Sequence, residues 1–437
     1  MARAKKEAAL TPEERLQAAL VPDWEWPYKL PENWCWLKLV ESFDNHTDSK
    51  KKIKQKDYLV KGKLAVVDQG QELIGGYTND VEKSYSGALP IVIFGDHTRC
   101  IKFVDFPFAQ GADGVKVLRP KPFYLPKAFY YALQSVNIPN LGYRRHFPLF
   151  NKFSIPLPPF AEQQRIVDRI ESLFAKLDEA KEKAQAVVDS FETRKAAILH
   201  KAFTGELTAK WREEHGVGMD SWRWIPLKKS GSWYGGGTPS MSRSEYWENG
   251  TLLWVTAKDM KSDLIEDTLM HTNMFGVENS SANYIAQPAV LFVMRSGILR
   301  RTFPVCMVKK PFTVNQDIKA LVPTDNIDLE YLFWGCKANE KRILESCMKN
   351  GTTVESINSA ALRDFEIPIA GSNEQIEIVR ILDAFFAKEQ QTKEAAEKVL
   401  DQIELMKKSI LARAFRGELG TNDPSEESAV ELLKRVL

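Results

Sequence analysis

The sequence lacks the residue patterns that mark most catalytic and metal-binding sites. Only five of its 437 residues are cysteine, and no two form a Cys-x-x-Cys pair, so neither a zinc site nor a disulfide framework is indicated. There is no Gly-x-x-x-x-Gly-Lys-Ser/Thr phosphate loop, no His-Glu-x-x-His helix and no Gly-x-Ser-x-Gly elbow. A run of Asn or Asp, two prolines and an aromatic residue, as amino-methyltransferases use around a flipped base, is also missing. The sequence therefore predicts a chain with no catalytic residues and no metal of its own.

Charge and hydrophobicity are also limited. The formal net charge is only +2 at pH 7, so a nucleic-acid surface would have to be a local basic patch. No apolar run approaches the length of a membrane span. The basic start, Met1–Lys6, is not followed by the apolar core of a secretory signal. We therefore expect a cytoplasmic protein that does not contact a membrane.

What the sequence does contain is a long internal repeat without gaps. Residues Glu162–Leu207 recur as Glu374–Leu419 at a constant offset of 212 residues, with 21 of 46 positions identical. Both copies follow a proline-containing entry and close on Ala-Phe-x-Gly-Glu-Leu. A repeat of this length is a whole structural unit, and two copies are too few for a solenoid. The sequence therefore predicts a single chain with pseudo-two-fold symmetry.

Each copy has the pattern of one long helix. In the first copy, apolar residues alternate at steps of four and three from Ile166 to Phe191, which keeps one stripe along an under-wound helix. Neither copy contains Pro or Gly before its closing motif, which predicts about 40 helical residues, or roughly 60 Å. Glu389 and Thr392 interrupt the stripe of the second copy. Because each stripe needs a partner, we expect the copies to form an antiparallel pair with each other; the alternative is two core helices in unrelated domains.

The segments that precede the two helices share a beginning but not their contents. Both contain short β-branched or aromatic runs bounded by Gly, Pro, Asn and Asp, which are typical of strands, followed by a short helical pattern at 127–134 or 329–346. The expected strands are Leu64–Asp68, Leu89–Gly95, Ile101–Val104, Val115–Leu118, Leu252–Thr256, Val290–Met294, Val305–Val308 and Ile318–Leu321. The expected fold class is α+β, with two mixed α/β domains separated by a long two-helix coiled coil.

Two loops of the first segment carry side chains suited to nucleic acid. Gly95–Arg99 is a polar turn after an apolar strand, and Asn140–His146 combines two arginines, an aromatic residue and a glycine. Arg, His and Thr side chains contact base edges or phosphates, although the first loop is equally compatible with a plain hairpin turn. The candidate residues of this segment are His97, Thr98, Arg99, Tyr143, Arg144 and Arg145.

The second segment has weaker but comparable signals. The glycines 235–237 form a loop that lets another backbone approach closely, although glycine clusters are mostly turns. Met294–Arg301 places three arginines around a glycine turn after a strand, and Asn350–Thr353 is a further polar stretch. The candidate residues of this segment are Thr238, Ser240, Lys258, Arg295, Arg300 and Arg301.

Together these features resemble the specificity (S, or HsdS) subunit of type I restriction–modification enzymes. The resemblance spans nearly the whole chain, and its most specific parts are the helix entry Ile155–Gln164 and the two Phe-x-Gly-Glu-Leu exits. Gly236–Ser240 and Tyr246–Thr256 are also typical of that family. The second entry, Ile367–Gln375, departs from it because the usual run of prolines is missing.

The resemblance implies a non-catalytic subunit that recognises double-stranded DNA. In that family, each variable domain is a target recognition domain that reads one half of a bipartite sequence. The helices set the spacer and dock two methyltransferase (M) subunits, and restriction (R) subunits join through the complex. S-adenosylmethionine, ATP and Mg would be bound by these partners, with no cofactor in this chain. The residues implied in partner binding are Phe203, Glu206, Leu207, Phe415, Glu418 and Leu419.

The expected domains follow the same division. They are a helical end (1–23), target recognition domain 1 (24–152), a spacer helix with its connector (153–218), target recognition domain 2 (219–364), the second spacer helix (365–420) and a second helical end (421–437). We expect the two ends to lie near one another, with 208–218 as their counterpart. The alternatives are a coiled-coil adaptor that binds only proteins, and a nuclease or methyltransferase with an unrecognised active site. DNA retention at low salt tests the first alternative, and DNA modification by the purified chain alone tests the second.

Overall fold

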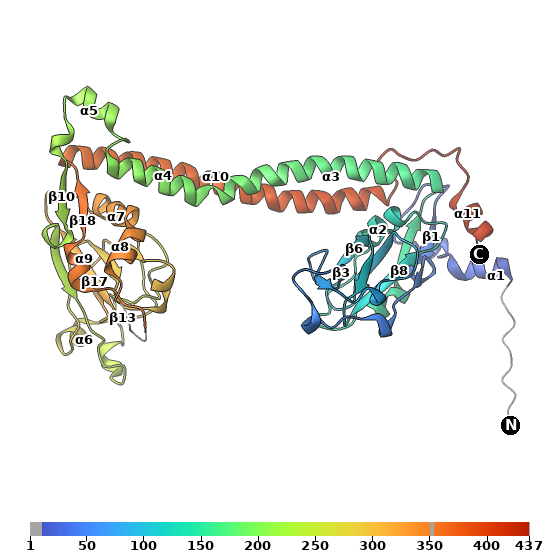
Figure 1. Cartoon of the computed structure of the whole chain (residues 1–437), viewed down its shortest axis with the longest axis horizontal. Helices are drawn as coiled ribbons and strands as arrows, with labels where there is room; N and C mark the ends of the chain where they lie inside the picture. The colour runs from blue at the N-terminus through green and yellow to red at the C-terminus, as the bar shows by residue number, and fades with distance from the viewer. Residues whose placement is uncertain (1–10, 350–353, 437) are drawn as a thin grey trace. The chain divides into compact units, whose positions relative to one another are not determined.

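The chain folds into two compact units, which the computed structural model describes at residues 11–349 and 354–436. Unit 1 consists of residues 1–185 and 398–437, and unit 2 consists of residues 186–397. Both units combine small sheets with helices, so the expected α+β class is confirmed (Figure 1). In the part of the chain that is described, no helix combines the length and the apolar character needed to cross a bilayer.

The strands of unit 1 form three sheets. A four-stranded antiparallel sheet has the order β2–β8–β5–β6, and a three-stranded sheet has the order β4–β3–β7, in which β3 and β7 run parallel. The third sheet pairs β1 with β9. The strands are β1 Cys35–Lys38, β2 Phe43–Asn45, β3 Leu64–Val67, β4 Gly76–Thr78, β5 Ile91–Gly95, β6 Ile101–Val104, β7 Phe108–Gln110, β8 Val115–Pro120 and β9 Ser154–Leu157.

Unit 2 has the same topology in strands that do not align in sequence. Its four-stranded sheet is β11–β17–β14–β15, its three-stranded sheet is β13–β12–β16 with β12 and β16 parallel, and β10 pairs with β18. Across the two units, all eight strands expected from the sequence are present, and each begins and ends within two residues of its expected bounds. The strands are β10 Arg223–Pro226, β11 Gly231–Gly235, β12 Leu252–Val255, β13 His271–Thr272, β14 Ala289–Val293, β15 Val305–Val308, β16 Phe312–Val314, β17 Ile318–Pro323 and β18 Glu366–Ile369.

The two-stranded sheets join the start of each segment to the entry of its long helix. Trp36 lies opposite Pro156 in the β1–β9 pair, and Trp224 lies opposite Pro368 in the β10–β18 pair. The second entry therefore forms the same pairing as the first, although it lacks the run of prolines. One proline at this position is enough for the pairing. It removes a single backbone N–H from an edge strand, and the other hydrogen bonds of the ladder remain.

The long helices are α3 (Phe160–Asp189), α4 (Phe191–Thr204) and α10 (Ser372–Ala414). In unit 1, Lys181 of α3 contacts Glu404 of α10 at 2.6 Å. In unit 2, Arg194 of α4 contacts Glu389 of α10 at 2.7 Å. Within unit 1, Asp178, which precedes Lys181 in α3, contacts Lys407, which follows Glu404 in α10. The two helices are therefore paired antiparallel, as expected.

The helix of the first repeat copy is interrupted at Ser190, a break that the apolar periodicity did not predict. Ser190 separates α3 from α4, and its hydroxyl donates to the carbonyl oxygen of Ala186 at 2.6 Å. A serine hydroxyl that bonds back to the preceding turn competes with the backbone ladder and bends a helix. The expected helix over 162–202 is therefore two helices, whereas the second copy is one helix of 43 residues.

Glu389, which interrupts the apolar stripe of the second repeat copy, has an ion-pair partner on the facing helix. The Nε of Arg194 donates to Glu389 at 2.7 Å, and the same guanidinium donates to the Val187 carbonyl oxygen at 3.3 Å. A charged seam residue is tolerated when its partner lies on the facing helix. In the first copy the position equivalent to Glu389 is the apolar Leu177.

Short helices cover the four-stranded sheets. In unit 1, α2 (Pro126–Ser135) packs on β5, β6 and β8. In unit 2, the single helix expected over 329–346 is instead two helices, α7 (Leu329–Ala338) and α8 (Glu340–Cys347). Asn339 leaves helical geometry at φ −105° and ψ 10°, and its Nδ2 donates to the Gly335 carbonyl oxygen at 2.8 Å. A short helix, α9 (Ser359–Asp364), then precedes β18.

The two helical ends of the chain meet in unit 1, as expected. Helix α1 (Pro12–Ala19) packs against α11 (Ala429–Val436), and the two helices lie side by side next to β1 (Figure 1). Leu16 and Leu433 are both buried in the core that also holds Phe415 of the second repeat copy. Residues 1–10 of the expected helical end, 1–23, lie outside the described residues.

The segment that follows each repeat copy contacts the beginning of the other copy. In unit 2, Thr208 donates from its hydroxyl to Glu374 at 2.6 Å, just before helix α5 (Ala209–His215). In unit 1, Thr421 donates to Glu162 at 3.1 Å. The connector 208–218 is thus the counterpart of the C-terminal segment in its contacts.

Candidate nucleic-acid interface

In unit 1, loops from several strands meet at one edge, which we call polar edge 1 and define as loops 68–69, 96–100 and 111–114. The Gly111 amide donates to the Val67 carbonyl oxygen at 2.8 Å, and the Asp96 amide donates to the Gly114 carbonyl oxygen at 2.6 Å. These bonds fix the ends of β3, β5 and β7 beside the beginning of β8. Polar edge 1 is therefore a single surface formed from loops that are far apart in the sequence.

Gln69 of the 68–69 loop fixes the position of the 96–100 loop through two hydrogen bonds. The side-chain oxygen of Gln69 accepts from the His97 amide at 3.2 Å, and its backbone carbonyl oxygen accepts from the Thr98 hydroxyl at 2.6 Å. Arg99 adopts a left-handed conformation at φ 62° and donates to the Ile138 carbonyl oxygen at 3.0 Å. The turn does connect β5 to β6 as a hairpin, and it also carries three of the expected side chains.

The second expected loop of unit 1 is fastened to polar edge 1 by a buried histidine. Nε2 of His146 accepts from the Leu141 amide at 3.1 Å, so Nδ1 carries the proton and donates to the Asp96 carbonyl oxygen at 2.8 Å. The ring of Tyr143 stacks on His97 with centroids 4.8 Å apart and planes 12° apart. All six candidate residues of unit 1 therefore lie together.

Two arginines at this edge are available to a ligand. Arg144 and Arg145 are exposed, and neither has an ion-pair or hydrogen-bond partner within residues 11–349 and 354–436. Tyr143 is 85% exposed. Free guanidinium groups beside an exposed aromatic ring can bind phosphates or guanine edges.

Unit 2 has an equivalent edge, polar edge 2, formed by loops 236–240, 256–259, 294–301 and 315–317. The Asn315 amide donates to the Val255 carbonyl oxygen at 3.1 Å, and the Met294 amide donates to the Asp317 carbonyl oxygen at 2.7 Å. These two bonds correspond to the two that hold polar edge 1. The structure thus brings the candidate residues of unit 2 to the same place in the topology as those of unit 1.

The glycine cluster of polar edge 2 has a steric cause. A Cβ atom on Gly236 would lie 1.8 Å from the Val314 carbonyl oxygen, and one on Gly237 would lie 2.0 Å from the Ser281 hydroxyl. The loop can lie this close to β16 only without side chains. It then presents Thr238, whose hydroxyl donates to Gln316 at 2.8 Å, and the exposed Ser240.

Two of the four cations of polar edge 2 are paired with carboxylates, and two have no such partner among the described residues. Arg295 donates to Asp317 at 2.9 Å, and Arg300 donates to Glu355, a hydrogen bond that holds the pKa of that carboxyl below its usual range. Lys258 and Arg301 are exposed and have no ion pair within the described chain. The polar stretch Asn350–Thr353 lies outside the described residues.

The residues that close the two repeat copies divide into buried and exposed members. Phe415 is fully buried, and Phe203 packs on Tyr331 with ring centroids 5.1 Å apart. Leu207 and Leu419 are partly buried against the same cores. Glu206 and Glu418 are exposed. A partner could reach the two glutamates, whereas the phenylalanines stabilise the units themselves.

Sequence reasoning missed the residues that position these loops. His146 and Gln69 carry no DNA-binding signature, and each acts through bonds to backbone groups. A signal was present for His146, which directly follows two arginines and precedes an apolar run. No comparable signal exists for Gln69, whose partners are about 30 residues away.

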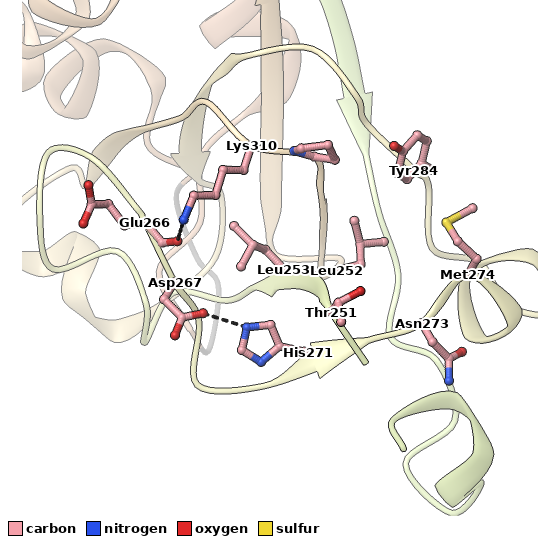
Figure 2. A pocket seen from close by; sticks show the side chains of 11 residues that line it. Thr251, Leu252, Leu253, Glu266, Asp267, His271, Asn273, Met274, Tyr284 and Lys310 are labelled. Carbon is pink, nitrogen blue, oxygen red and sulfur yellow. Dashed lines mark hydrogen bonds and ion pairs between the residues drawn. The ribbon is translucent and has the colours of Figure 1, made fainter. Parts of the chain in front are cut away.

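Unit 2 also contains a pocket at the opposite ends of β12 and β16, away from polar edge 2. Figure 2 shows His271 facing Asp267, with Nε2 and Oδ1 2.6 Å apart, and Lys310 donating to the Glu266 carbonyl oxygen at 2.8 Å. The Thr268 amide, and then His271, lower the pKa of Asp267. None of the expected site residues lines this pocket. Within the described chain, no group of three or more His, Cys, Asp or Glu side chains is placed to hold a metal ion.

The sequence matches one family model and a characterised relative over most of its length. The sequence model described as "Type I restriction modification DNA specificity domain" matches residues 31–188 and 234–401. The "Type I restriction enzyme EcoR124I/EcoR124II specificity subunit" of Escherichia coli is 31% identical over 368 residues, which cover 80% of this chain and 86% of that protein.

Two solved structures share the fold. The HsdS subunit from Thermoanaerobacter tengcongensis has a TM-score of 0.54 at 19% identity, covering 90% of this chain and 100% of that one. A chain from work on complex assembly and conformational transition of the type I R-M system has a TM-score of 0.65 at 19% identity, with the same coverage. At this identity the structures support the fold alone.

Proposed function

Because this chain belongs to the family of type I restriction–modification DNA specificity subunits, we propose that each of its units reads one half of a split DNA sequence. As a specificity subunit, it is a non-catalytic part of a type I restriction–modification complex. Residues 24–152 and 219–364 are the proposed target recognition domains, with spacer helices in 153–218 and 365–420 and helical ends in 1–23 and 421–437.

The observation that best supports two different half-sites is a comparison of the units. They share a topology, but the side chains at their polar edges differ. The bond between Gly111 and Val67 in unit 1 corresponds to the bond between Asn315 and Val255 in unit 2. Where unit 1 presents Tyr143 with two adjacent free arginines, unit 2 presents a threonine, a serine, a lysine and one free arginine, Arg301. A common frame with different contact residues is what two different half-sites require.

The proposed contacts are side chains at the two edges. In unit 1 these are His97, Thr98, Arg99, Tyr143, Arg144 and Arg145. In unit 2 these are Thr238, Ser240, Lys258, Arg295, Arg300 and Arg301. Arginine donates in a fork to the O6 and N7 of guanine, whereas lysine and hydroxyl groups contact phosphates and several bases. Arg295 and Arg300 would exchange their carboxylate partners for DNA, so we expect them to contribute less affinity than free arginines.

The antiparallel helices supply the proposed spacer and docking surface. Half-site centres on the order of 10 bp apart would place both edges on one side of the duplex. Two methyltransferase subunits would dock on the helices, with Glu206 and Glu418 within reach, and restriction subunits would join through the complex. These partners would bind S-adenosylmethionine, ATP and Mg, and the complex would act on DNA in the cytoplasm.

Mapping of methylated adenine in cells that co-express this chain and its methyltransferase partner tests the proposal. The expected result is a split motif with an unspecified spacer, which disappears when this chain is deleted. A continuous motif would contradict the reading of two half-sites. A soluble complex of the two proteins that neither methylates nor retains DNA at low salt would favour the adaptor alternative.

A further inference from the structure

Each unit has a groove between its recognition domain and its helix pair, and the two grooves are lined by equivalent positions of the repeat. Groove 1, in unit 1, has a volume of about 830 Å³, and groove 2, in unit 2, has a volume of about 600 Å³. Five positions of α10 line groove 1, and the five positions 212 residues earlier, in α4, line groove 2. Among these pairs are Lys407 with Lys195 and Leu411 with Leu199. The symmetry of the repeat therefore produces two related surfaces.

The opposite walls are also equivalent, and they include residues of the polar edges. The end of α2 contributes Gln134 to groove 1, and the end of α7 contributes Lys337 to groove 2. The loop before β6 contributes Arg99, and the loop before β15 contributes Arg301. Each groove is therefore continuous with the edge that we propose reads bases.

The repeat lysine of each groove rests on an aromatic ring of the other repeat copy. The Lys407 ammonium lies 5.1 Å from the centre of the Phe174 ring, and the Lys195 ammonium lies 5.6 Å from that of Phe386. Phe174 and Phe386 are themselves 212 residues apart. A lysine over a ring face keeps its charge while losing freedom, so both ammonium groups are held in place inside the grooves. Asp178 of α3, which does not line groove 1, lies 2.5 Å from the Lys407 ammonium.

Lining cations outnumber lining carboxylates in both grooves, and two of those in groove 2, Lys195 and Lys337, lie 3.7 Å and 3.3 Å from Asp263. Groove 1 has three cationic lining residues and one carboxylate, Glu404, which is already paired with Lys181. Groove 2 has four cationic lining residues and two carboxylates, one of which, Glu340, accepts from the Phe303 amide at 2.8 Å. Lys408 of groove 1 is exposed and has no ion pair within the described chain. Each groove thus contains a cation without an ion pair in the described chain, Lys408 in groove 1 and Arg301 in groove 2, that is available to an anion.

We propose that both grooves bind backbone phosphates of the DNA next to the bases read by the same unit. This inference rests on the proposed function. Lysine and arginine in a groove beside a reading edge are typical of phosphate contacts, which orient a duplex without selecting a sequence. Because equivalent repeat positions line both grooves, the two halves of the target receive the same sequence-independent contact. The helices then hold DNA as well as separating the two recognition domains.

Two single variants test the proposal: Lys408→Ala in groove 1 and Lys341→Ala in groove 2. Lys341 is 90% exposed, and its ammonium lies 3.9 Å from Glu345, so its loss should not disturb folding. The full chain, purified with its methyltransferase partner, is titrated at several salt concentrations. One duplex carries the mapped split sequence, and a second duplex of equal length is scrambled. The control is the double variant Lys176→Ala/Lys388→Ala, which removes repeat-related lysines that line neither groove.

Each groove variant should weaken binding to both duplexes by the same factor, roughly fivefold to tenfold near 0.1 M salt. The slope of log K against log salt should fall by about 1 for each groove lysine removed, and by about 2 when Lys408→Ala and Lys341→Ala are combined. The control should keep both affinity and slope. An unchanged slope, or a loss confined to the split sequence, would overturn the proposal.

The same titration separates failure of this inference from failure of the proposed function. A wild-type complex that binds both duplexes equally contradicts sequence reading itself. A wild-type complex that prefers the split sequence, with groove variants that bind like wild type, contradicts only the phosphate grooves. Weaker assembly with the methyltransferase at unchanged DNA affinity would identify the grooves as protein-docking sites and would also overturn the inference.

Discussion

The indole Nε1 of Trp34 donates to the carboxylate of Glu162 at 2.7 Å, and Glu162 has no measurable exposed surface. The equivalent pair in unit 2 is Trp222 with Glu374, at 2.9 Å. In each unit a tryptophan from the beginning of the proposed recognition domain is thus bonded to the first glutamate of the repeat copy. Each glutamate also accepts from a threonine hydroxyl, Thr421 in unit 1 and Thr208 in unit 2. The difference is that Glu374 accepts in addition from the guanidinium of Arg212, at 2.6 Å.

The first prediction concerns pH and Glu162. Burial raises the pKa of this carboxyl, while bonds from Trp34 and Thr421 oppose the shift. A carboxyl whose pKa is higher in the folded state stabilises that state below its unfolded pKa, and this contribution is lost as pH rises through the folded value. We expect unit 1 to lose stability as pH rises from about 4.5, and Glu162→Gln to flatten the profile. Urea unfolding followed by tryptophan fluorescence across this range measures the effect, and a Glu162→Gln profile parallel to wild type would contradict it.

The second prediction concerns the ion pair in unit 2. Arg212→Ala would leave Glu374 buried without its cation and would also remove the bond from Arg212 to the Gly205 carbonyl oxygen. Loss of one member of a buried pair typically costs about 3–5 kcal/mol. Chemical unfolding should show this loss in the transition of unit 2 alone. Lys210→Ala, at a side chain that is 88% exposed, should change stability by less than about 0.5 kcal/mol.

The third prediction concerns the glycine loop of polar edge 2. In Gly236→Ala, the new methyl group would overlap the Val314 carbonyl oxygen, so the loop that carries Thr238 must move. We expect methylation of the split motif to fall, with relaxed recognition in the half read by unit 2 only. Gly371→Ala is the matched control, since a Cβ atom there would meet only Ser221, at 3.9 Å. Relaxation in both halves would count against independent reading by the two units.

The fourth prediction concerns the free arginines of polar edge 1. Arg144→Ala and Arg145→Ala should each weaken binding, by about 1–3 kcal/mol if the side chain reads a base edge. A variant that reads a base should also relax one position of the half-site read by unit 1. A contact to phosphate would instead lower affinity equally for all sequences. Competition titrations with duplexes altered in one half at a time distinguish these results, and equal relaxation of the other half would contradict the assignment.

The fifth prediction concerns spacing. Insertion of four residues at Ser190 extends the helix there by about 6 Å, against 3.4 Å per base pair along one strand. We expect the unspecified spacer to lengthen by about one or two base pairs, with both half-sequences unchanged. Motif mapping in cells that express the insertion variant provides the measurement. Altered half-sequences with the original spacing would show that the helices do not set the distance.

The repeat was sufficient to predict the paired helices, because a stripe from Ile166 to Phe191 cannot be buried by one helix alone. The strands were predictable for a similar local reason, since runs such as Ile91–Gly95 have strong β preference. The breaks at Ser190 and Asn339 were not predictable from periodicity. Each results from a polar side chain that bonds to a backbone carbonyl oxygen, and many such side chains occur in helices without breaking them.

The grouping of site residues depended on tertiary contacts. His97 and Tyr143 are 46 residues apart, and they stack because His146 anchors the second loop to Asp96. Nothing in either loop alone encodes that bond. Composition could identify the basic and aromatic loops, but their common location required the strand order. The common topology of the two units was hidden for the same reason, because it lies in pairing and not in matching residues.

The order in which the chain is synthesised has a consequence for how it folds. Unit 2 is one continuous segment, 186–397, whereas the core of unit 1 joins Leu16 and Trp34 to Phe415 and Leu433. The hydroxyl of Tyr28 donates to the Phe415 carbonyl oxygen across 387 residues of sequence. Domains generally fold as units during synthesis, with the N-terminal one first, but here the core that holds Leu16 and Trp34 is complete only after Leu433 has left the ribosome. Unit 2 can therefore be complete while part of the core of unit 1 still exposes apolar surface.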